Sequence, residues 1–246
     1  MFDPFGDYDT AGYLRNLEGL KDPDEIKEQE HAFFEANLED ALALLKSAKG
    51  PLTYKHFLEV HGILFSEFYP WAGKDRQMLS VGNLVGKGSV QFEAADGCRR
   101  AIDWGLSVGN DVNAMRSKHG MVMGAFAWGH PFLDGNGRTM LLLHTELCAR
   151  AGFSIDWRQA KKIDYLRNLT LELETPDKGL LDRYFQPLIR ELMPRVDWVK
   201  HIKLLPGLDG THESDDNIAY RDDDPVALKR YAEAKRSRDE SARKPF

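Results

Sequence analysis

The sequence predicts an all-α fold with one small β-hairpin, and three observations carry this prediction. Apolar residues recur at helical spacing over most of the chain, several of these segments start with a good capping residue, and one glycine-rich segment is instead rich in β-forming residues. The chain has 246 residues, of which 42% are hydrophobic. It is therefore long enough to bury a sizeable core, in one large domain or in one domain with appendages.

The first long helix is expected within residues 22–51, after an irregular lead-in. Asp22 is a suitable N-cap, Pro23 fits the first helical position, and acidic residues follow in the first turn. The apolar residues after them keep a helical period, and Gly50-Pro51 ends the helix.

A second helix is expected within residues 52–73, with Thr53 as its cap and Tyr69-Pro70 at its end. In residues 76–92, short β-prone runs flank a glycine-rich turn, which predicts an exposed β-hairpin. The chain then returns to a helical period. The further helices are expected within residues 93–109, 114–130, the segment that follows a loop at 130–138, 156–179 and 180–196.

The end of the chain, residues 205–246, differs in composition from the rest. It is acidic and glycine-rich at first and then highly charged. Such a composition buries little surface, so we expect a flexible tail or one that docks through a partner. The domain is therefore expected to span residues 1–204, with its core at about 50–195.

Composition narrows the classes of function. The formal net charge is −6 and the pI is about 5.8, which does not favour direct binding to nucleic acid or to an anionic membrane. No apolar run is long enough to span a bilayer, and the first residues do not resemble a secretory signal. Cys98 and Cys148 fit neither a disulfide framework nor a zinc site. A cytoplasmic location is expected, and export as an effector by a dedicated system stays open.

The segment HPFLDGNGRTMLLLHTELCARAG, residues 130–152, carries a glycine-rich loop directly before an apolar helix. The first N–H groups of a helix have no acceptor within it, and the helix dipole favours an anion there. Gly135 and Gly137 let the backbone present these groups. Asn136 and Arg138 add side-chain donors that suit phosphate oxygens. The loop therefore predicts an anion-binding site.

Two further residues of this loop give the anion site a chemistry. Asp134 is a hard carboxylate, and beside a phosphate it is a natural Mg²⁺ ligand. His130 could take a proton from an incoming hydroxyl. A turn of this kind is common and a single histidine is usually unremarkable in function, but their combination between two apolar helices predicts transfer from a nucleotide.

The stretch HPFLDGNGR resembles the signature of the Fic family, H-x-F-x-[D/E]-G-N-G-R-x-x-R, at every specified position up to Arg138. The flanking helices and YPWAGKDRQ, residues 69–77, are also similar to the Fic core, so the likeness extends over roughly residues 12–195. The resemblance implies a Fic-like helical bundle with a small β-hairpin flap, and it identifies residues 1–204 as a Fic domain with an N-terminal helical lead-in.

Fic proteins mostly transfer AMP from ATP to a Ser, Thr or Tyr hydroxyl of a target protein. The resemblance thus implies His130 as general base, Asp134 as the Mg²⁺ ligand, ATP as co-substrate, and Phe132 as an anchor in the core. It assigns the phosphate-binding loop to Gly135, Asn136, Gly137 and Arg138. The hairpin would hold the target segment by strand addition, with flap residues Met78, Leu79, Ser80, Val81 and Lys87.

The chain departs from the signature at its last position, where Leu141 replaces a second arginine. In the family that arginine contacts the outer phosphates of ATP. The Doc branch also lacks it and phosphorylates its target, but Doc-like motifs depart from G-N-G, which is intact here. AMP transfer is the favoured hypothesis. A Doc-like phosphotransferase or other phosphate-linked transferase, and a catalytically degraded interaction module, are the alternatives.

Regulation within the family often uses an inhibitory [S/T]-x-x-x-E-[G/N] helix. Glu18-Gly19 has the right ending, but Leu14 stands where Ser or Thr is required, so we do not expect an inhibitory helix there. A separate small antitoxin-like partner is the better candidate for an inhibitor. We expect the four histidines His56, His61, His119 and His144 to be ordinary helix residues.

Overall fold

The computed structural model describes residues 3–87, 90–176, 178–205, 218–220 and 223–242. The helices of these residues are α1 (Tyr8–Ala11), α2 (Pro23–Ser47), α3 (Tyr54–Phe65), α4 (Cys98–Asn110), α5 (Val112–Gly129), α6 (Asn136–Arg150), α7 (Lys162–Glu174), α8 (Leu180–Phe185), α9 (Trp198–Lys203) and α10 (Pro225–Ala242). The strands are β1 (Val85–Lys87), β2 (Val90–Gln91), β3 (Phe153–Ile155), β4 (Ile189–Glu191) and β5 (Ile218–Tyr220).

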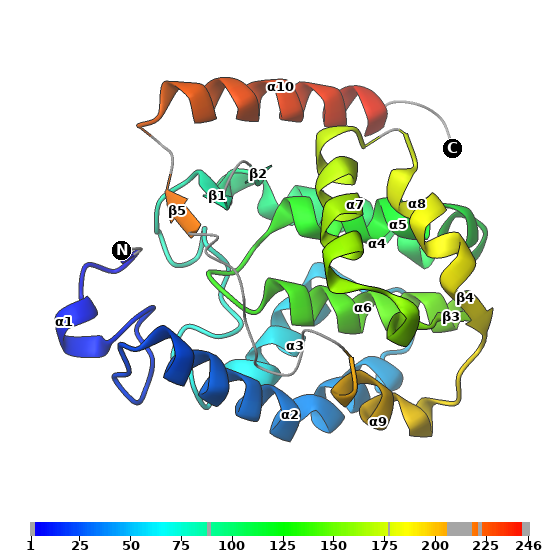
Figure 1. Ribbon diagram of the computed structural model, residues 1–246, viewed down its shortest axis with the longest axis horizontal. Helices are drawn as coiled ribbons and strands as arrows, with labels where there is room; N and C mark the ends of the chain where they lie inside the picture. The colour runs from blue at the N-terminus through cyan, green and yellow to red at the C-terminus, as the bar shows by residue number, and fades with distance from the viewer. Residues whose placement is uncertain (1–2, 88–89, 177, 206–217, 221–222, 243–246) are drawn as a thin grey trace.

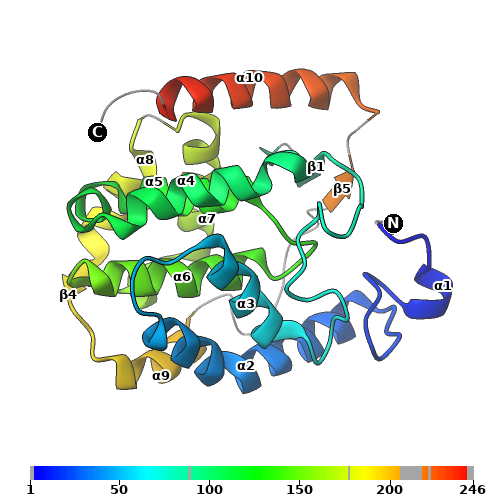
Figure 2. The ribbon, with the colours of Figure 1, turned by 180° about the vertical axis from the view of Figure 1, so that it is seen from behind.

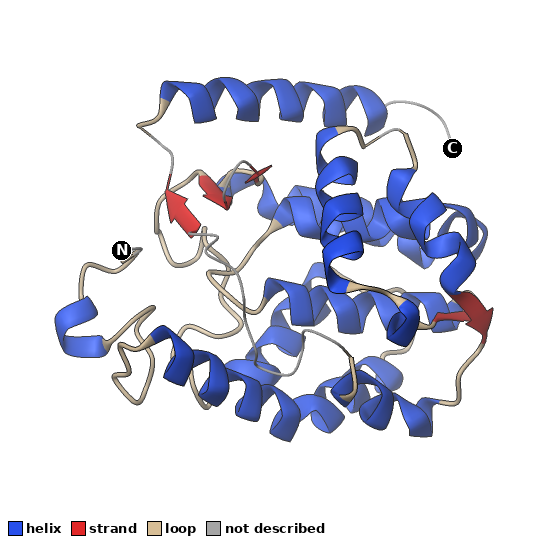
Figure 3. Ribbon diagram, in the orientation of Figure 1, coloured by secondary structure: helices blue, strands red, loops and turns tan. Residues whose placement is uncertain are grey.

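The helices are arranged in tiers around α5 and α6 (Figures 1 and 3). α5 packs against α4, α6, α7 and α8, while α2 packs against α3. Seen from behind, α2 and α3 lie on one side of α6, with α4 and α5 on the other and α10 beyond them (Figure 2). The prediction of an all-α bundle is confirmed, since the strands of the described residues are at most three residues long.

The two helix starts predicted from capping residues are confirmed. The Asp22 side chain accepts hydrogen bonds from two N–H groups in the first turn of α2, and Pro23 is its first residue. Thr53 begins α3 in a capping box with His56. α3 ends at Phe65 rather than at Tyr69, and the residues between them form turns.

The predicted helix over residues 180–196 is wrong beyond its first turns. α8 ends at Phe185, and Pro187 lies just after it. Proline has no N–H and its ring clashes with the preceding turn, so it cannot continue a helix. The chain instead forms β4, which pairs antiparallel with β3 directly after α6. The pair fixes the end of α6 against the last part of the bundle.

The predicted hairpin at 76–92 is present but shorter than expected. β1 and β2 pair antiparallel, with Gly86 opposite Gln91 and Lys87 opposite Val90. Residues 76–80, which were expected to belong to the hairpin, form turns before it. The centre of the expected turn, residues 88–89, lies outside the described residues. The opposite edge of β1 pairs with β5, so the sheet has the order β2-β1-β5.

The end of the chain also differs from the prediction of a flexible tail. Residues 225–242 form α10, which lies along the bundle beside α7 and the hairpin (Figure 1). The composition is charged, as noted, but Tyr231, Lys235 and Arg238 each contact buried parts of the bundle. Residues 206–217, on which the rest of this prediction falls, lie outside the described residues. None of the described helices is long and apolar enough to cross a membrane.

Candidate nucleotide-binding and catalytic site

His130 is the turning point between α5 and the motif loop. It is the C-cap of α5, and its backbone is left-handed, with φ 39° and ψ 57°. That conformation normally favours glycine, and for other residues it costs about 1–3 kcal/mol. The surrounding contacts must therefore hold His130 in place. Its carbonyl oxygen accepts a hydrogen bond from Arg76 Nε at 2.9 Å.

Arg76 connects this turn to the hairpin and is fully buried. Its guanidinium donates to three carbonyl oxygens, those of His130, Asn83 and Glu93, at 2.9, 2.9 and 2.6 Å. Its own N–H donates to the carbonyl of Pro131 at 2.8 Å. A guanidinium has five N–H donors in a rigid plane, so one arginine can bind carbonyl oxygens of the motif turn and of the hairpin at the same time. In the sequence, Arg76 stood out only as part of the segment 69–77 that resembles the Fic core. Its role in holding the turn at His130 was not predicted.

The His130 ring is held flat against Phe92 of the segment after β2. The two ring centroids are 3.8 Å apart and the planes are 9° from parallel. Nε2 of His130 is buried and has no hydrogen-bond partner among the described residues. Burial lowers the pKa of His130 well below its usual range, and the charges of Arg76 and Lys87 lower it further. A neutral imidazole with an unpaired nitrogen is the form that can accept a proton.

The motif loop is closed by Asn136, the first residue of α6. Its side chain accepts from the N–H of Phe132 at 2.9 Å and donates to the carbonyl of Phe132 at 2.8 Å. The Phe132 ring is buried and stacks on His61, with centroids 3.7 Å apart. Phe132 is thus an anchor, as expected. The Asn136 side chain, predicted as a phosphate donor, uses its oxygen and one of its two amide hydrogens within the loop, so the other amide hydrogen and the backbone N–H are left for an anion.

Gly135 and Gly137 have different roles in this loop. Gly135 precedes α6 with φ 73°, and a Cβ built on it would lie 2.5 Å from the Phe65 ring. Gly137 is exposed, and a Cβ built on it would meet nothing within 4 Å. The N–H groups of residues 136–138 belong to the first turn of α6 and have no acceptor earlier in that helix. Open space therefore lies where a ligand could approach these N–H groups.

Alanine at the two glycines should separate folding from nucleotide binding. Gly135→Ala forces a side chain into the left-handed region and into Phe65, so we expect a loss of about 1–3 kcal/mol in stability. Gly137→Ala should leave stability unchanged or slightly higher, because alanine suits a helix. Its methyl group should nevertheless weaken ATP binding by at least about tenfold, a cost of about 1.4 kcal/mol. Thermal unfolding and ATP titration of both variants measure this; equal ATP binding by Gly137→Ala and the wild type would contradict the placement of the anion.

Asp134 lies at the mouth of the loop, and its backbone is supported by His61. Asp134 Oδ1 accepts the N–H of Gly135 at 2.6 Å. The N–H of Gly73 donates to His61 Nδ1 at 2.9 Å, so the proton of the neutral ring is on Nε2, which donates to the Asp134 carbonyl at 3.0 Å. His61 was expected to be an ordinary helix residue. The one feature of the sequence that could have indicated its role is that a histidine lies on the apolar face of α3.

Replacing His61 by glutamine should make the protein less sensitive to acid. Burial lowers the pKa of His61 to about 3, whereas an unfolded histidine titrates near 6.5. The unfolded chain therefore binds this proton first. The His61 contribution to stability is complete above about pH 6.5 and is lost toward about pH 3, at about 1.4 kcal/mol per pH unit. Glutamine keeps a donor and an acceptor but does not titrate. Urea unfolding of both proteins between about pH 7 and about pH 4 tests this; a constant difference in stability would contradict it.

Arg138 does not point freely into the open space above the loop. Its guanidinium contacts Glu30 Oε2 of α2 at 2.5 Å and lies over the rings of Phe65 and Phe34, 4.7 and 5.7 Å from their centroids. Burial would lower the pKa of Arg138, but the carboxylates of Glu30 and Asp134 raise it, so the group is charged. Burial raises the pKa of Glu30, and Arg138 opposes this.

Glu30 is a residue that sequence analysis missed. It lies on the buried face of α2, among positions that otherwise read as apolar. Glu18, which was weighed as an inhibitory glutamate, is exposed in a segment of turns. The carboxylate beside the motif arginine therefore comes from α2 and pairs with Arg138. Leu141, where the family signature has its second arginine, is buried in the core, and no charge replaces it at that position.

The flap residues predicted from the resemblance are not all part of the hairpin. Met78 is exposed, Ser80 has a left-handed backbone, and Leu79 and Val81 pack partly against the core. These four residues lie in and just after the turns that precede β1. Lys87 is the charged one of the five flap residues, and its charge lowers the pKa of His130.

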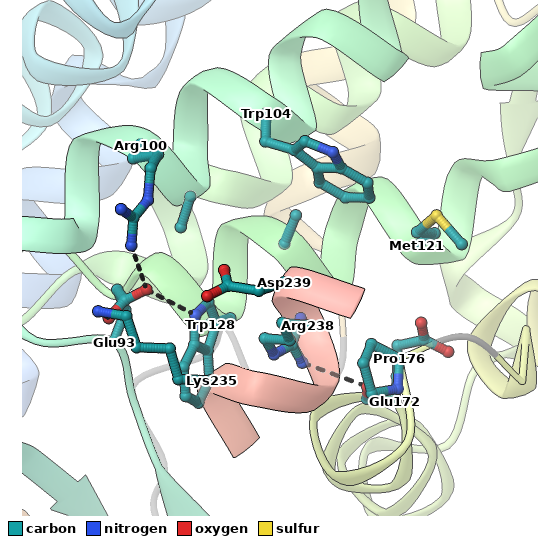
Figure 4. Close-up of a pocket in the computed structure, with 12 residues that line it drawn as sticks. Glu93, Arg100, Trp104, Met121, Trp128, Glu172, Pro176, Lys235, Arg238 and Asp239 are labelled. Atoms are coloured by element: carbon teal, nitrogen blue, oxygen red, sulfur yellow. Dashed lines mark hydrogen bonds and ion pairs between the residues drawn. The ribbon is translucent and has the colours of Figure 1, made fainter. Parts of the chain in front are cut away.

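A separate cavity of about 140 Å³ lies between α10 and the bundle (Figure 4). Its walls include Trp104, Trp128 and Arg238, and none of the motif residues 130–138 lines it. Arg238 lies over Trp128, 4.7 Å from the ring, and donates to the carbonyl of Glu172. The cavity thus lies at the contact of α10 with the bundle, and not at the motif loop.

Residues 51–148 match the sequence model of the Fic/DOC family. Over these residues the chain resembles the Fic/DOC family. The motif loop, residues 130–138, lies within the matched residues. The match ends before β3 and the helices from α7 onward.

Two curated proteins resemble this chain. It is 29% identical over 168 residues to the protein adenylyltransferase VbhT of Bartonella schoenbuchensis, which covers 67% of this chain and 34% of that protein. It is also 29% identical over 159 residues to a Sinorhizobium fredii protein described as a probable protein adenylyltransferase, covering 61% of this chain and 77% of that protein. The chain thus spans about a third of the length of VbhT.

Solved structures show the same fold. One is the N-terminal Fic domain of a VirB-translocated Bep effector protein from Bartonella quintana with bound ADP, which covers 77% of this chain and 96% of that one with a TM-score of 0.60 and 20% identity. At this identity the likeness concerns the fold alone. It confirms the Fic-like helical bundle expected from the resemblance.

Proposed function

We propose that the chain is a protein adenylyltransferase, which moves AMP from ATP to a Ser, Thr or Tyr hydroxyl of a target protein. One observation carries the proposal above the others. The unpaired Nε2 of a neutral His130 lies on the loop that ends at the open first turn of α6. Two relatives that are 29% identical bear the name of this activity, the second as a probable one, which supports it.

His130 would act as the general base of this reaction. The target hydroxyl oxygen attacks the α-phosphorus of ATP, the bond from that phosphorus to the oxygen bridging to the β-phosphate breaks, and pyrophosphate leaves. The hydroxyl proton passes to Nε2 of His130. Arg76 and Phe92 hold the imidazole in the orientation needed, because one binds its carbonyl oxygen and the other stacks on its ring.

The first turn of α6 would hold the phosphates. The N–H groups of residues 136–138 and the charge of Arg138 favour an anion at this place. Glu30 already neutralises part of the Arg138 charge, so the guanidinium acts as a fixed donor rather than as a free arm. Gly135 and Asn136 would maintain the backbone conformation of the loop.

Asp134 fits an Mg²⁺ ion as a single ligand rather than as a member of a protein cage. No group of three or more acidic, His or Cys side chains suited to a metal occurs in the described part of the chain. One oxygen of Asp134 accepts the Gly135 N–H, and the other remains for a metal. Mg²⁺ usually takes one or two carboxylates together with substrate phosphates and water. Bound there, it would neutralise phosphate charge.

The missing second arginine favours one alternative, transfer of the γ-phosphoryl group as in the Doc branch. Leu141 leaves the outer phosphates without the cation that the family signature supplies there. A degraded interaction module is a weaker alternative, because such a module would have no need of a neutral base beside an anion site. An antitoxin-like protein remains our candidate for an inhibitory partner.

Labelled ATP distinguishes these functions. The protein is incubated with Mg²⁺, a bacterial lysate and ATP labelled at either the α- or the γ-phosphate. AMP transfer predicts protein-bound label from the α-phosphate alone, and its loss when Mg²⁺ is chelated. Label from the γ-phosphate alone would assign the chain to the phosphotransferases. Absence of label, together with absence of ATP binding, would favour the interaction module.

A further inference from the structure

The outer edge of β1 is already occupied by another strand of the same chain. β5 pairs antiparallel with β1, with Tyr220 opposite Val85, Ala219 opposite Gly86 and Ile218 opposite Lys87. In Figure 1, β5 lies directly beside β1, although some 130 residues separate the two in the sequence. The strand β1 of the hairpin, to which the Fic resemblance assigns target docking, therefore has neighbours on both edges.

The hydrogen bonds of β1 show which of its residues direct their main-chain N–H and C=O groups toward β5. The N–H of Phe92 donates to the carbonyl of Val85, so the main-chain groups of Val85 face β2. Successive residues of a strand alternate in direction, so the N–H and C=O of Gly86 face β5. In this register the partner of Gly86 is Ala219. The contact thus depends on the main chain of one central residue pair, which a different extended segment could replace.

The strand β1 is connected to His130 from its β2 side and from its end. Phe92, which bonds to Val85, is the residue whose ring stacks on His130. Lys87, at the other end of β1, has a charge that acts on the same imidazole. A peptide segment that replaced β5 would pair with Lys87, whose charge acts on the His130 ring.

A second contact keeps the end of the chain beside the hairpin. Tyr231 of α10 donates to Glu93 at 2.5 Å, and Lys235 contacts the same carboxylate at 3.3 Å. The Trp128 and Tyr231 rings are stacked, with centroids 6.1 Å apart. Glu93 lies two residues after β2, and α10 begins five residues after β5. α10 thus tethers β5 close to the edge it occupies (Figure 2).

We propose that β5 is a replaceable occupant of a strand-docking surface on β1, and that the partner of this surface is an extended peptide segment. The assignment of that partner to a modified target rests on the proposed function. Three residues form a short strand, so exchange costs little. The sequence on either side of β5, SDDNIAYRDDD over residues 214–224, is acidic, which indicates an acidic extended segment as the best competitor beside Lys87.

The test compares two substitutions at the centre of β5 in the full chain. Ala219→Pro removes the N–H that pairs with Gly86 and fixes φ, so it should release β5 from the edge. Ala219→Val keeps the N–H and favours a strand, and it is the matched control. The probe is a fluorescent peptide with the sequence of residues 214–224. Its binding is measured by anisotropy, and thermal unfolding confirms that both variants remain folded.

We expect the Ala219→Pro protein to bind the peptide at least about tenfold more tightly than the wild type or Ala219→Val, because a tethered strand competes at millimolar effective concentration. Equal binding by all three proteins, or no binding by Ala219→Pro, would overturn the inference. Transfer from α-labelled ATP is measured in parallel. If the peptide binds but none of the three proteins transfers label, the proposed function is refuted and the docking surface stands. If label is transferred but all three proteins bind the peptide equally, the docking surface is refuted and the proposed function stands.

Discussion

Replacing His130 by alanine should reduce transfer from ATP to protein by about 10²–10⁴-fold while leaving the fold and ATP binding intact. The reason is geometric. His130 Nε2 has no partner among the described residues, so its removal leaves no buried group unsatisfied. The anion site belongs to the first turn of α6 and does not depend on the imidazole.

The control for this prediction is His201→Ala on α9, where the histidine is 3.8 Å from Asp156 and far along the chain from the motif. Initial rates of label incorporation and ATP titrations of both variants give the comparison. If His130→Ala kept more than about a tenth of the wild-type rate, His130 would not be the general base, since such groups contribute at least 10²-fold.

Removing Glu30 should have the largest effect on stability among single substitutions at the site. Glu30→Ala leaves the Arg138 guanidinium buried over two aromatic rings, with only Asp134 to offset its charge. Breaking a buried pair by removing one partner costs about 3–5 kcal/mol. ATP should restore part of this loss, because a bound phosphate would neutralise Arg138 and stabilise the folded state by mass action. Urea unfolding with and without ATP measures both effects.

Two further variants separate charge from packing. Glu30→Gln keeps a hydrogen-bond acceptor for Arg138 and should lose less stability than alanine. The double variant Glu30→Leu with Arg138→Leu removes both charges, and it should be more stable than either single variant, as buried pairs replaced by apolar residues often are. It should nevertheless bind ATP poorly. Additive losses in the double variant would show that the two side chains do not act as a pair.

Local signals predicted the helices well where their boundaries depend on neighbouring residues. Asp22 with Pro23 and the Thr53 cap marked the starts of α2 and α3 because capping acts within a few residues. The failures involve distant contacts. Nothing near residue 220 in the sequence shows that it pairs with residue 85, and the charged composition of α10 does not show that Tyr231 reaches Glu93.

The site divides in the same way. The motif holds His130, Asp134 and the start of α6 within nine consecutive residues, so the sequence alone could predict that they lie together. Arg76, His61 and Glu30 come from separate segments and act on the loop through its carbonyl oxygens and its arginine. The bonds from the Asn136 amide to Phe132 could not be predicted for a similar reason, because only the folded loop brings the two together.

Peptide mass spectrometry gives the most direct test of AMP transfer through His130. A bacterial lysate is incubated with the protein, ATP and Mg²⁺, and its peptides are compared with those from a reaction with His130→Ala. The structure predicts a mass increase of one AMP group on Ser, Thr or Tyr side chains, absent in the variant reaction. An increase of one phosphate group, or AMP adducts of equal abundance in both reactions, would contradict the assignment.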